Sequence, residues 1–332
     1  MNSQGAIEGY YGHGGAGIGR TRLYSRPVFT MPRPLPDLAG RARGALLGLA
    51  AGNALGVPSE FLHTPDAIAA RFPGGVRDIL PGAAAPWDDD LALAVCLAEE
   101  LLEPEVSLER LAHRWIGWMN DDGRGIGIWT ARALGHLATH GSPPSSTGGQ
   151  AGNGSVSRCI PVALATLNSP GNLVSGSYHT AALTHPDERC AWGAVAVNVA
   201  GHCLLRGIGD FLPEVLDVLR TNQAPDELIE AVRRVPVERR EELPVTGPQA
   251  GYVVHCVEIA LWFAYHEPNL ERGLIWLANA GGDTDTNAAV AGALMGARDG
   301  EGAIPVRWIE SLHEQPRLRR LAHRLVGLEP DS

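Results

Sequence analysis

The sequence predicts an all-α protein. From Leu38 onward, apolar runs of helix length, rich in alanine and glycine, follow one another, and most are closed by glycine or proline. No hairpin signal interrupts them, and strands do not alternate with helices as they do in βαβ folds. Small residues at three- and four-residue spacing let helix backbones come close, so we expect a compact globule of helices that cross at steep angles.

The apolar runs give the expected helices in order. They lie near residues 41–55, 91–103, 107–120, 129–140, 160–167, 179–184, 187–206, 211–220, 225–235, 251–265, 269–280, 286–298 and 305–325, with Pro316 as a candidate break in the last. Residues 1–38 are rich in Gly, Pro and Arg and show no apolar periodicity. We therefore divide the chain into a flexible tail, residues 1–38, and a single helical domain, residues 39–330.

Composition excludes several classes of function. The 332 residues are 45% apolar and 19% charged, which is ordinary for a folded globular protein. A formal charge of −10 argues against nucleic acid as the main partner, because binding phosphates needs a basic face. The chain contains no lysine. Schiff-base chemistry and a lysine-based phosphate loop are therefore excluded.

Five cysteines, widely spaced and odd in number, are expected to be reduced residues of the core. They form no CxxC motif or Cys/His cluster of the kind that binds zinc. No apolar run reaches the roughly 18 residues needed to span a bilayer. The start of the chain shows no signal-peptide pattern, so we expect a cytoplasmic protein without a membrane partner.

Three adjacent carboxylates, Asp88, Asp89 and Asp90, stand immediately before the run that begins at Leu91. One aspartate at this place would cap a helix, which is the common role of such a residue. Three exceed that role, because neighbouring carboxylates repel one another unless a cation or several N–H donors hold them. A metal turn and a capped helix both remain open for this segment.

A second acidic turn has the same design. Asp283, Asp285 and Thr286 follow a pair of glycines and precede another helical run. Hard oxygen ligands without His or Cys suit Mg²⁺, Mn²⁺ or Ca²⁺ rather than zinc. The two turns together could hold two cations, and two independently capped helices are the alternative.

The chain resembles the ADP-ribosylglycohydrolase family, which includes the dinitrogenase reductase-activating glycohydrolases and the ADP-ribosyl-acceptor hydrolases. The resemblance runs from Arg41 to about Gly300 and rests on five blocks in the family's order. They are the segments 43–61 (RGALLGLAAGNALGVPSEF), 87–90 (WDDD), 152–155 (GNGS), 183–186 (LTHP), and 251–254 (GYVV) followed by 281–286 (GGDTDT). It implies an all-helical fold of this type and hydrolysis of the bond between C1″ of ADP-ribose and an acceptor.

The resemblance also implies a set of site residues. Two Mg²⁺ ions, with Mn²⁺ as the alternative, would be held by Asp88, Asp89, Asp90, Asp283, Asp285 and Thr286. Glu60 would orient or activate water beside the metals, with Asp89 and Asp90 as further catalytic carboxylates. Asn153, Gly154, Ser155, His185 and Tyr252 match residues that approach the substrate. By chemistry alone, Glu60 would be a solvated loop residue, Asn153 part of a turn, His185 a helix-end residue and Tyr252 a core aromatic.

Three residues depart from the family's pattern. Asn53 stands where many members have Asp, and Asp88 stands where the family has Thr. Gly125 falls where arginine-specific members often carry Asp, and glycine cannot serve as a base. Asp121 and Asp122, just upstream, are candidates to replace that carboxylate. These departures leave arginine-linked, serine-linked, nucleic-acid-linked and small-molecule conjugates of ADP-ribose open as substrates.

Two classes of function therefore remain. One is a metal-dependent glycohydrolase acting on an ADP-ribose conjugate, in which a water attacks C1″ through an oxocarbenium-like state. The other is a non-catalytic member that binds ADP-ribose-like nucleotides, or a structural protein of the crystallin kind that shares the fold. Because both acidic turns are retained, the sequence favours the enzyme. It leaves the oligomeric state open, a monomer included.

Overall fold

A computed structural model describes residues 37–60, 62–85, 87–146 and 150–329. Within them the fold is all-α, as predicted, and the only bridge of β type is an isolated one between Gly152 and Tyr252. The α-helices are α2 (Leu38–Gly56), α3 (Pro65–Arg71), α4 (Asp89–Leu101), α5 (Leu108–Asp121), α6 (Ile128–His140), α7 (Pro161–Ala165), α8 (Leu173–Ala182), α9 (Glu188–Leu205), α10 (Leu212–Thr221), α11 (Asp226–Arg234), α12 (Val253–His266), α13 (Leu270–Ala278), α14 (Thr284–Asp299), α15 (Val306–Ser311) and α16 (Gln315–Leu325). Short 3₁₀ turns are η1 (Val57–Ser59), η2 (Asn153–Ser155), η3 (Pro170–Asn172), η4 (Arg240–Glu242) and η5 (Glu301–Ala303).

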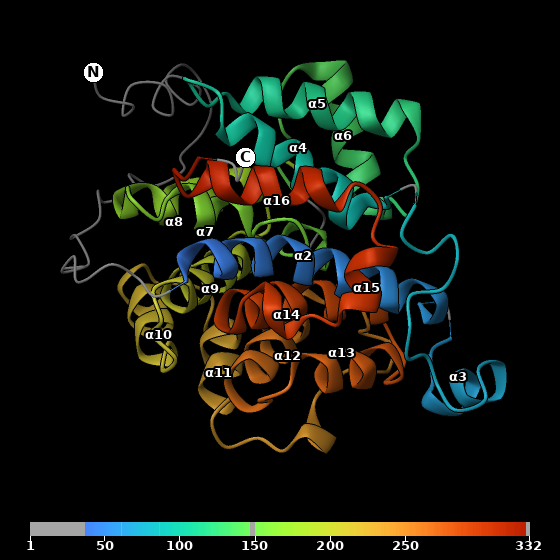
Figure 1. Ribbon diagram of the computed structural model, residues 1–332. Coiled ribbons are helices and arrows are strands. Elements are labelled where there is room, and N and C mark those ends of the chain that lie inside the picture. The colour runs from blue at the N-terminus through green and yellow to red at the C-terminus, as the bar shows by residue number, and fades with distance from the viewer. Residues whose placement is uncertain (1–36, 61, 86, 147–149, 330–332) are drawn as a thin grey trace.

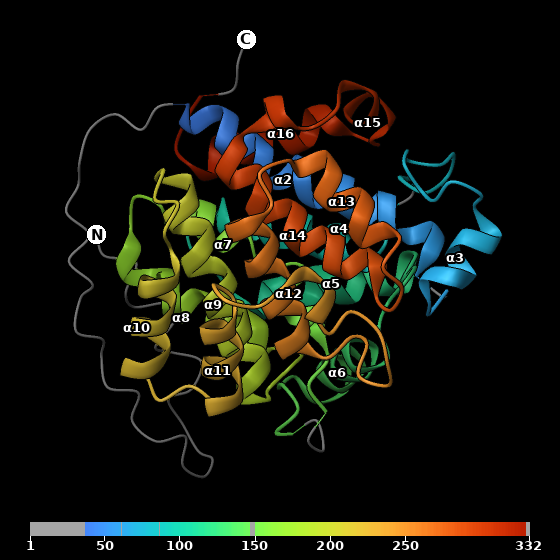
Figure 2. The same cartoon turned by 90° about the horizontal axis from the view of Figure 1, so that it is seen from below.

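Two helices, α2 and α14, lie side by side through the middle of the molecule (Figures 1 and 2). The helices α12 and α13 cover one side of this pair, α16 crosses α2 on the other, and α9 packs across its end. Helices α4, α5 and α6 form a layer beyond α16 and enclose a second, smaller apolar cluster around Trp115. The central pair therefore holds together segments from both ends of the described chain.

Glycines set the separation of α2 and α14. A Cβ atom added at Gly48 or Gly52 would overlap backbone carbonyl groups of α14, and one added at Gly292 or Gly296 would overlap those of α2. Both helices are buried over most of their length. Glycine normally weakens a helix, and here the loss is offset by backbone contact that no larger residue would permit.

Several expected boundaries were wrong. Helix α3 was not predicted, and α8 begins at Leu173 rather than near residue 179. The break in the last predicted helix falls at residues 312–314, before Pro316, because proline is tolerated in the first turn where its missing N–H costs nothing.

Four of the five cysteines are buried and none is bridged, as predicted. No helix among the described residues is long and apolar enough to cross a membrane. Most of the predicted tail, residues 1–36, lies outside the described residues.

Candidate active site

Both acidic turns stand at helix N-termini, and both open on one cavity. Asp88 is the N-cap residue of α4 and Asp283 that of α14, yet neither side chain makes a capping hydrogen bond to its own helix. The cavity has a volume of about 710 Å³. The fold therefore brings the two turns together at one cavity, and their role as metal turns stays a prediction.

Ten of the predicted site residues line this cavity together. They are Glu60, Asp89, Asp90, Asn153, Gly154, His185, Tyr252, Asp283, Asp285 and Thr286. They come from six segments of the chain that are separated by as many as 226 residues (286 − 60). Asp88 and Ser155 are the two predicted residues that do not line it.

Asp88 lies behind the cavity wall, where Asn53 holds it. The amide Nδ2 of Asn53 donates to Oδ2 of Asp88 over 2.8 Å and to Oδ2 of Asp90 over 3.4 Å. Burial raises the pKa of Asp88, and the hydrogen bond from Asn53 partly offsets this rise. The departure from Asp to Asn at residue 53 thus supplies a donor where a further carboxylate would add repulsion.

Glu60 is fixed by the contact between the end of α2 and the start of α14. The hydroxyl of Thr284 donates to the Gly56 carbonyl over 2.9 Å, and the hydroxyl of Ser59 donates to the Ala278 carbonyl over 2.6 Å. Burial, together with the charges of Asp283 and Asp88, raises the pKa of Glu60 to about 7. A carboxylate with such a pKa can accept a proton at neutral pH, which is the property expected of a general base.

The remaining carboxylates repel one another in buried or partly buried positions. Burial and the charge of Asp88 raise the pKa of Asp89 to about 8, although the backbone N–H of Gly127 donates to it over 3.4 Å. Burial and neighbouring aspartates raise the pKa of both Asp90 and Asp285 well above the ordinary range. Each of these groups would be stabilised in its charged form by a nearby cation.

Two oxygens support the fit of a hard cation. Oδ1 of Asp88 and Oδ1 of Asp285 are buried and have no hydrogen-bond partner among the described residues. A buried carboxylate oxygen without a partner is costly, so each calls for a ligand. As the side chains stand, no three His, Cys, Asp or Glu residues of the described chain are grouped tightly enough to hold one ion. The donor types and the unpartnered oxygens fit magnesium, and the ligand set stays a prediction.

The 152–155 loop is anchored to two distant segments. The backbone N–H of Asn153 donates to the Gly251 carbonyl over 3.0 Å, and that of Val253 donates to the Ala151 carbonyl over 2.9 Å. The side chain of Asn153 donates to Oδ2 of Asp283 over 2.8 Å. Ser155 is buried, and its hydroxyl donates to the Cys190 carbonyl over 3.2 Å. Its predicted contact with substrate stays a prediction, and its side chain serves here to hold the loop on α9.

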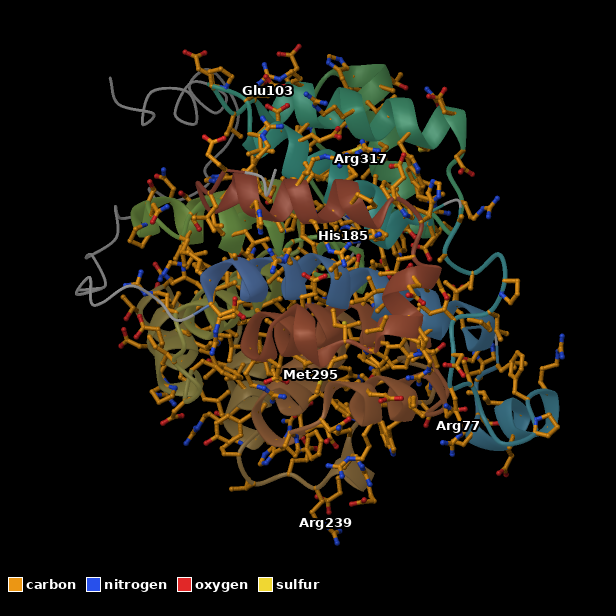
Figure 3. The ribbon with its side chains drawn as sticks, in the orientation of Figure 1. Arg77, Glu103, His185, Arg239, Met295 and Arg317 are labelled. Atoms are coloured by element: carbon orange, nitrogen blue, oxygen red, sulfur yellow. The ribbon has the colours of Figure 1, made fainter. Side chains whose placement is uncertain are left out.

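His185 is a neutral imidazole on the cavity wall, near the middle of the molecule (Figure 3). Burial and the charge of Arg158 lower the pKa of His185 to about 3. Arg158 donates to the Thr184 hydroxyl, and that hydroxyl lies 2.8 Å from Nδ1 of His185. Because arginine can only donate, the hydroxyl hydrogen of Thr184 is available to Nδ1. This favours the tautomer in which Nε2 carries the hydrogen.

Tyr252 stands at the outer rim of the cavity with two charged partners. Its hydroxyl donates to Glu227 over 2.5 Å and accepts from Arg189 over 3.3 Å. The Arg189 guanidinium also lies 5.6 Å from the centre of the Tyr252 ring. Tyr252 is thus only partly buried and belongs to a polar cluster. An aromatic residue of the core would be fully buried among apolar side chains.

Gly125 borders the first acidic turn, and its backbone conformation and neighbours explain why a glycine stands there. Its φ is +72°, and a Cβ added there would lie 3.0 Å from Cβ of Asp88 and 3.1 Å from Oδ1 of Asp89. Neither Asp121 nor Asp122, the candidate replacements for a carboxylate here, lines the cavity. Ile128 and Trp129 form this wall instead, with the Ile128 side chain 59% exposed.

The sequence did not single out several residues that complete the site. Arg158 is fully buried beneath the 152–155 loop, donates to the Gly154 carbonyl, and lies 4.5 Å from the centre of the Trp115 ring. Arg189 and Glu227 make the rim. The only signals for the two arginines were their places shortly after the GNGS and LTHP blocks, and nothing in the local sequence pointed to Glu227.

Comparison with known proteins agrees with this geometry. Residues 34–332 match the ADP-ribosylglycohydrolase family. The chain is 29% identical to the ADP-ribosylarginine hydrolase Tri1 of Serratia proteamaculans, with 90% of this chain and 82% of that one covered. It is 28% identical to the ADP-ribosyl-[dinitrogen reductase] glycohydrolase of Rhodospirillum rubrum, over 88% and 98% of the two chains.

A solved structure shows the same fold. It is described as an ADP-ribosylglycohydrolase-related protein complex and superposes with a TM-score of 0.73 at 32% identity, over 87% of this chain and 98% of the other. The family match covers every block of the sequence resemblance and every residue that lines the cavity. The chain belongs to the ADP-ribosylglycohydrolase family and is a hydrolase that acts on glycosidic bonds.

Proposed function

We propose that the chain removes ADP-ribose from an N- or O-linked acceptor by cleaving the glycosidic bond at C1″, and that the activity depends on Mg²⁺. One observation carries the proposal: Glu60 and both acidic turns face one cavity of about 710 Å³, where the buried Oδ1 of Asp285 lacks a partner among the described residues, as does that of Asp88 behind the wall. The volume lies in the range of sites that enclose small molecules. The names of the two curated relatives support ADP-ribose as the group that is released.

Asp88, Asp89 and Asp90 on one side and Asp283, Asp285 and Thr286 on the other would hold the metal. Bound there, Mg²⁺ would offset the carboxylate charges, act as a Lewis acid toward water and serve as a template for the ribose hydroxyls. Mn²⁺ offers the same hard-ligand chemistry. The unpartnered oxygens of Asp88 and Asp285 support this assignment.

Glu60 would accept a proton from the attacking water, because its carboxylate lines the cavity beside both acidic turns. The water oxygen forms a bond to C1″ while the bond from C1″ to the acceptor breaks. The acceptor leaves with the electron pair and takes up a proton. The carboxylates around the cavity would favour the positive charge that develops on the ribose ring in an oxocarbenium-like transition state.

The remaining predicted residues would bind the substrate. Asn153 and Gly154 present a loop at the cavity wall, and His185 would donate from Nε2. Tyr252 would bound the substrate at the rim, together with Arg189. Arg158 would hold the loop and His185 in place from beneath, because it donates to Gly154 and to Thr184.

The acceptor would be selected by shape rather than by an unpaired charge. Gly125 offers no carboxylate, and the carboxylate of Glu227 is already engaged by Tyr252 and Arg189. Ile128 and Trp129 form part of the cavity wall. This wall does not by itself distinguish arginine-linked from serine-linked or other conjugates.

The test is the release of free ADP-ribose from arginine-linked, serine-linked and terminal-phosphate-linked conjugates, with Mg²⁺ or with EDTA. We compare the wild type with Asp283→Ala and with Asp217→Ala, a control on the exposed face of α10. The proposal would be supported if the wild type and Asp217→Ala release ADP-ribose from one linkage, only with Mg²⁺, while Asp283→Ala releases none. The linkage that is cleaved would name the acceptor. Equal release in EDTA would overturn the metal dependence. Binding of ADP-ribose without release from any linkage would favour a binding protein.

A further inference from the structure

We propose that a second hollow, at the end of α4 away from the acidic turn, binds a small anion that carries two or more phosphate groups. The hollow has a volume of about 410 Å³ and is lined by four arginines, Arg114, Arg317, Arg320 and Arg324, with Glu99 and Glu103. Glu103 and Arg317 mark it in the upper part of Figure 3. The proposal does not rest on the proposed function of the first cavity.

The two carboxylates of the hollow are already paired. Arg114 donates from Nη2 to Glu103 over 2.8 Å and lies 3.6 Å from Glu99. Arg317 donates to Glu99 over 2.5 Å. The two carboxylates that line the hollow are therefore paired with Arg114 and Arg317, which also pair with Glu100 and Glu314 outside the lining. The other two arginines of the lining take no part in these ion pairs.

Arg320 and Arg324 are one helical turn apart on α16 and are both exposed. Neither has a hydrogen bond or an ion pair with any of the described residues. The helix dipole favours a cation in the last turn, which accounts for Arg324 alone. It explains neither Arg320 nor the gathering of four guanidinium groups around one hollow in a chain with a formal charge of −10.

The lining indicates the class of ligand. The planar guanidinium fork matches phosphate oxygens in pairs, and two forks one turn apart suit adjacent phosphate groups. The volume is within the range of small-molecule sites and exceeds what a single ion needs. Among the described residues, Leu102 and Leu321 are the only apolar ones that line the hollow, and none of the residues that line it is aromatic, so no ring is available to stack on a base. Recognition would therefore depend on the phosphate groups.

One side chain of the hollow, Arg317, also reaches the residue that precedes the first acidic turn. The Arg317 guanidinium lies 5.4 Å from the centre of the Trp87 ring, and Trp87 directly precedes Asp88. An anion that contacts Arg317 would change the electrostatic surroundings of that indole ring. Tryptophan fluorescence therefore gives a readout of binding that does not depend on catalysis.

The experiment is calorimetric titration of the full chain with inorganic pyrophosphate and with tripolyphosphate, in metal-free buffer of low ionic strength. The test variant is Arg320→Gln/Arg324→Gln, and it should fold normally because both side chains are exposed. The matched control is Arg233→Gln/Arg239→Gln, which removes the same charge from exposed arginines; Arg239 lies at the opposite end of the molecule (Figure 3).

We expect the test variant to bind at least about tenfold more weakly than the wild type, and the control to bind as the wild type does. Arg320→Lys/Arg324→Lys should fall between them, since lysine keeps the charge and loses the fork. A fluorescence change on binding should be reduced in Trp87→Phe. Circular dichroism of each variant checks that the helices are intact.

Three outcomes would overturn the proposal. The first is equal affinity of the wild type and the Arg320→Gln/Arg324→Gln variant. The second is loss of binding in Arg189→Gln alone, which would place the anion in the first cavity that Arg189 lines. The third is an acidic peptide such as oligoglutamate binding to these arginines when neither phosphate compound does, which would make the hollow a docking site for a protein segment.

Discussion

The amide of Asn153 donates to Oδ2 of Asp283 over 2.8 Å, and this bond joins the loop expected to meet the substrate to the second acidic turn. The two residues are 130 apart in the sequence. Because the same loop is tied through its backbone to Gly251 and Val253, the contact fixes where the Asp283 carboxylate points.

Replacing Asn153 with Ala should therefore lower kcat/KM by about 10- to 100-fold, the usual effect of removing a group that orients a metal ligand or catalytic carboxylate. The loss should be accompanied by weaker binding of Mg²⁺, measured by titration. Asn222→Ala is the control, since that amide donates only to a carbonyl within α10. An Asn153→Ala enzyme with unchanged kcat/KM and Mg²⁺ affinity would contradict the orienting role.

Asn53→Asp restores the residue that many family members carry, and we expect it to destabilise the metal-free protein. In the wild type the Nδ2 of Asn53 donates to Asp88 and Asp90, and the change would replace this donor by a further carboxylate beside them. The free energy of unfolding should fall by about 1–3 kcal/mol. Urea unfolding with and without Mg²⁺ checks this. If the site holds cations, Mg²⁺ should restore more stability to the variant than to the wild type.

Asp90→Asn should separate stability from function. Asp90 is buried beside Asp88 and Asp89, so its charge is unfavourable in the folded, metal-free chain. We expect the amide to raise the free energy of unfolding by roughly 1–2 kcal/mol and to abolish hydrolysis. Thermal unfolding and ADP-ribose release, measured on the same preparation, test both parts. A variant that is both less stable and fully active would argue against repulsion at this turn.

His202 should make the fold sensitive to acid. Burial lowers the pKa of His202 to about 4. Unfolded histidine takes up a proton near pH 6.5, so its contribution to stability is present above that pH and is lost as the pH falls toward 4. Between pH 7 and 4.5, His202→Gln should lose about 2–3 kcal/mol less stability than the wild type. Parallel curves for the two proteins, from urea unfolding at each pH, would be inconsistent with a neutral, buried His202.

Gly52→Ala should be strongly destabilising, because the added methyl group would overlap the Ala288 carbonyl of α14. We expect a loss of about 3 kcal/mol, as overpacking between two backbones cannot relax through side chains. Gly117→Ala on the exposed face of α5 is the matched control: its Cβ would meet nothing within 4 Å. That change should raise stability by about 0.5–1 kcal/mol. Similar effects of the two changes on the urea midpoint would refute the close approach of α2 and α14.

The helical class and most helices could be predicted because their apolar runs are long and closed by glycine or proline. Helix α3 could not, since only Ile68 of its seven residues is buried and it has no apolar periodicity. The break before Pro316 was misplaced because the sequence does not show whether a proline begins a helix or interrupts one. The backbone at Glu314, with a φ of 50°, shows that Pro316 lies in the first turn of a new helix.

The site, like the fold, could be predicted only in part. The acidic turns were visible because adjacent carboxylates are rare and their repulsion needs an explanation. The donors that organise the site were not visible. Asn53 and Gly127 donate to the first acidic turn, Arg158 donates to Thr184, and these contacts join residues 26 to 38 apart in the sequence. A buried arginine beneath a glycine loop has no local signature. Only the path of the chain brings it there.

The glycine contact between α2 and α14 also bears on how such a protein can change over time. Helix α2 leads to Glu60, and α14 begins at the second acidic turn. The distance between these two parts of the reaction centre is therefore set by direct backbone contact at glycine residues, where no larger side chain fits. Gradual substitution cannot adjust it. New acceptors would have to be accommodated by the loop of residues 122–127 and the start of α6, which can vary while the reaction centre is inherited unchanged.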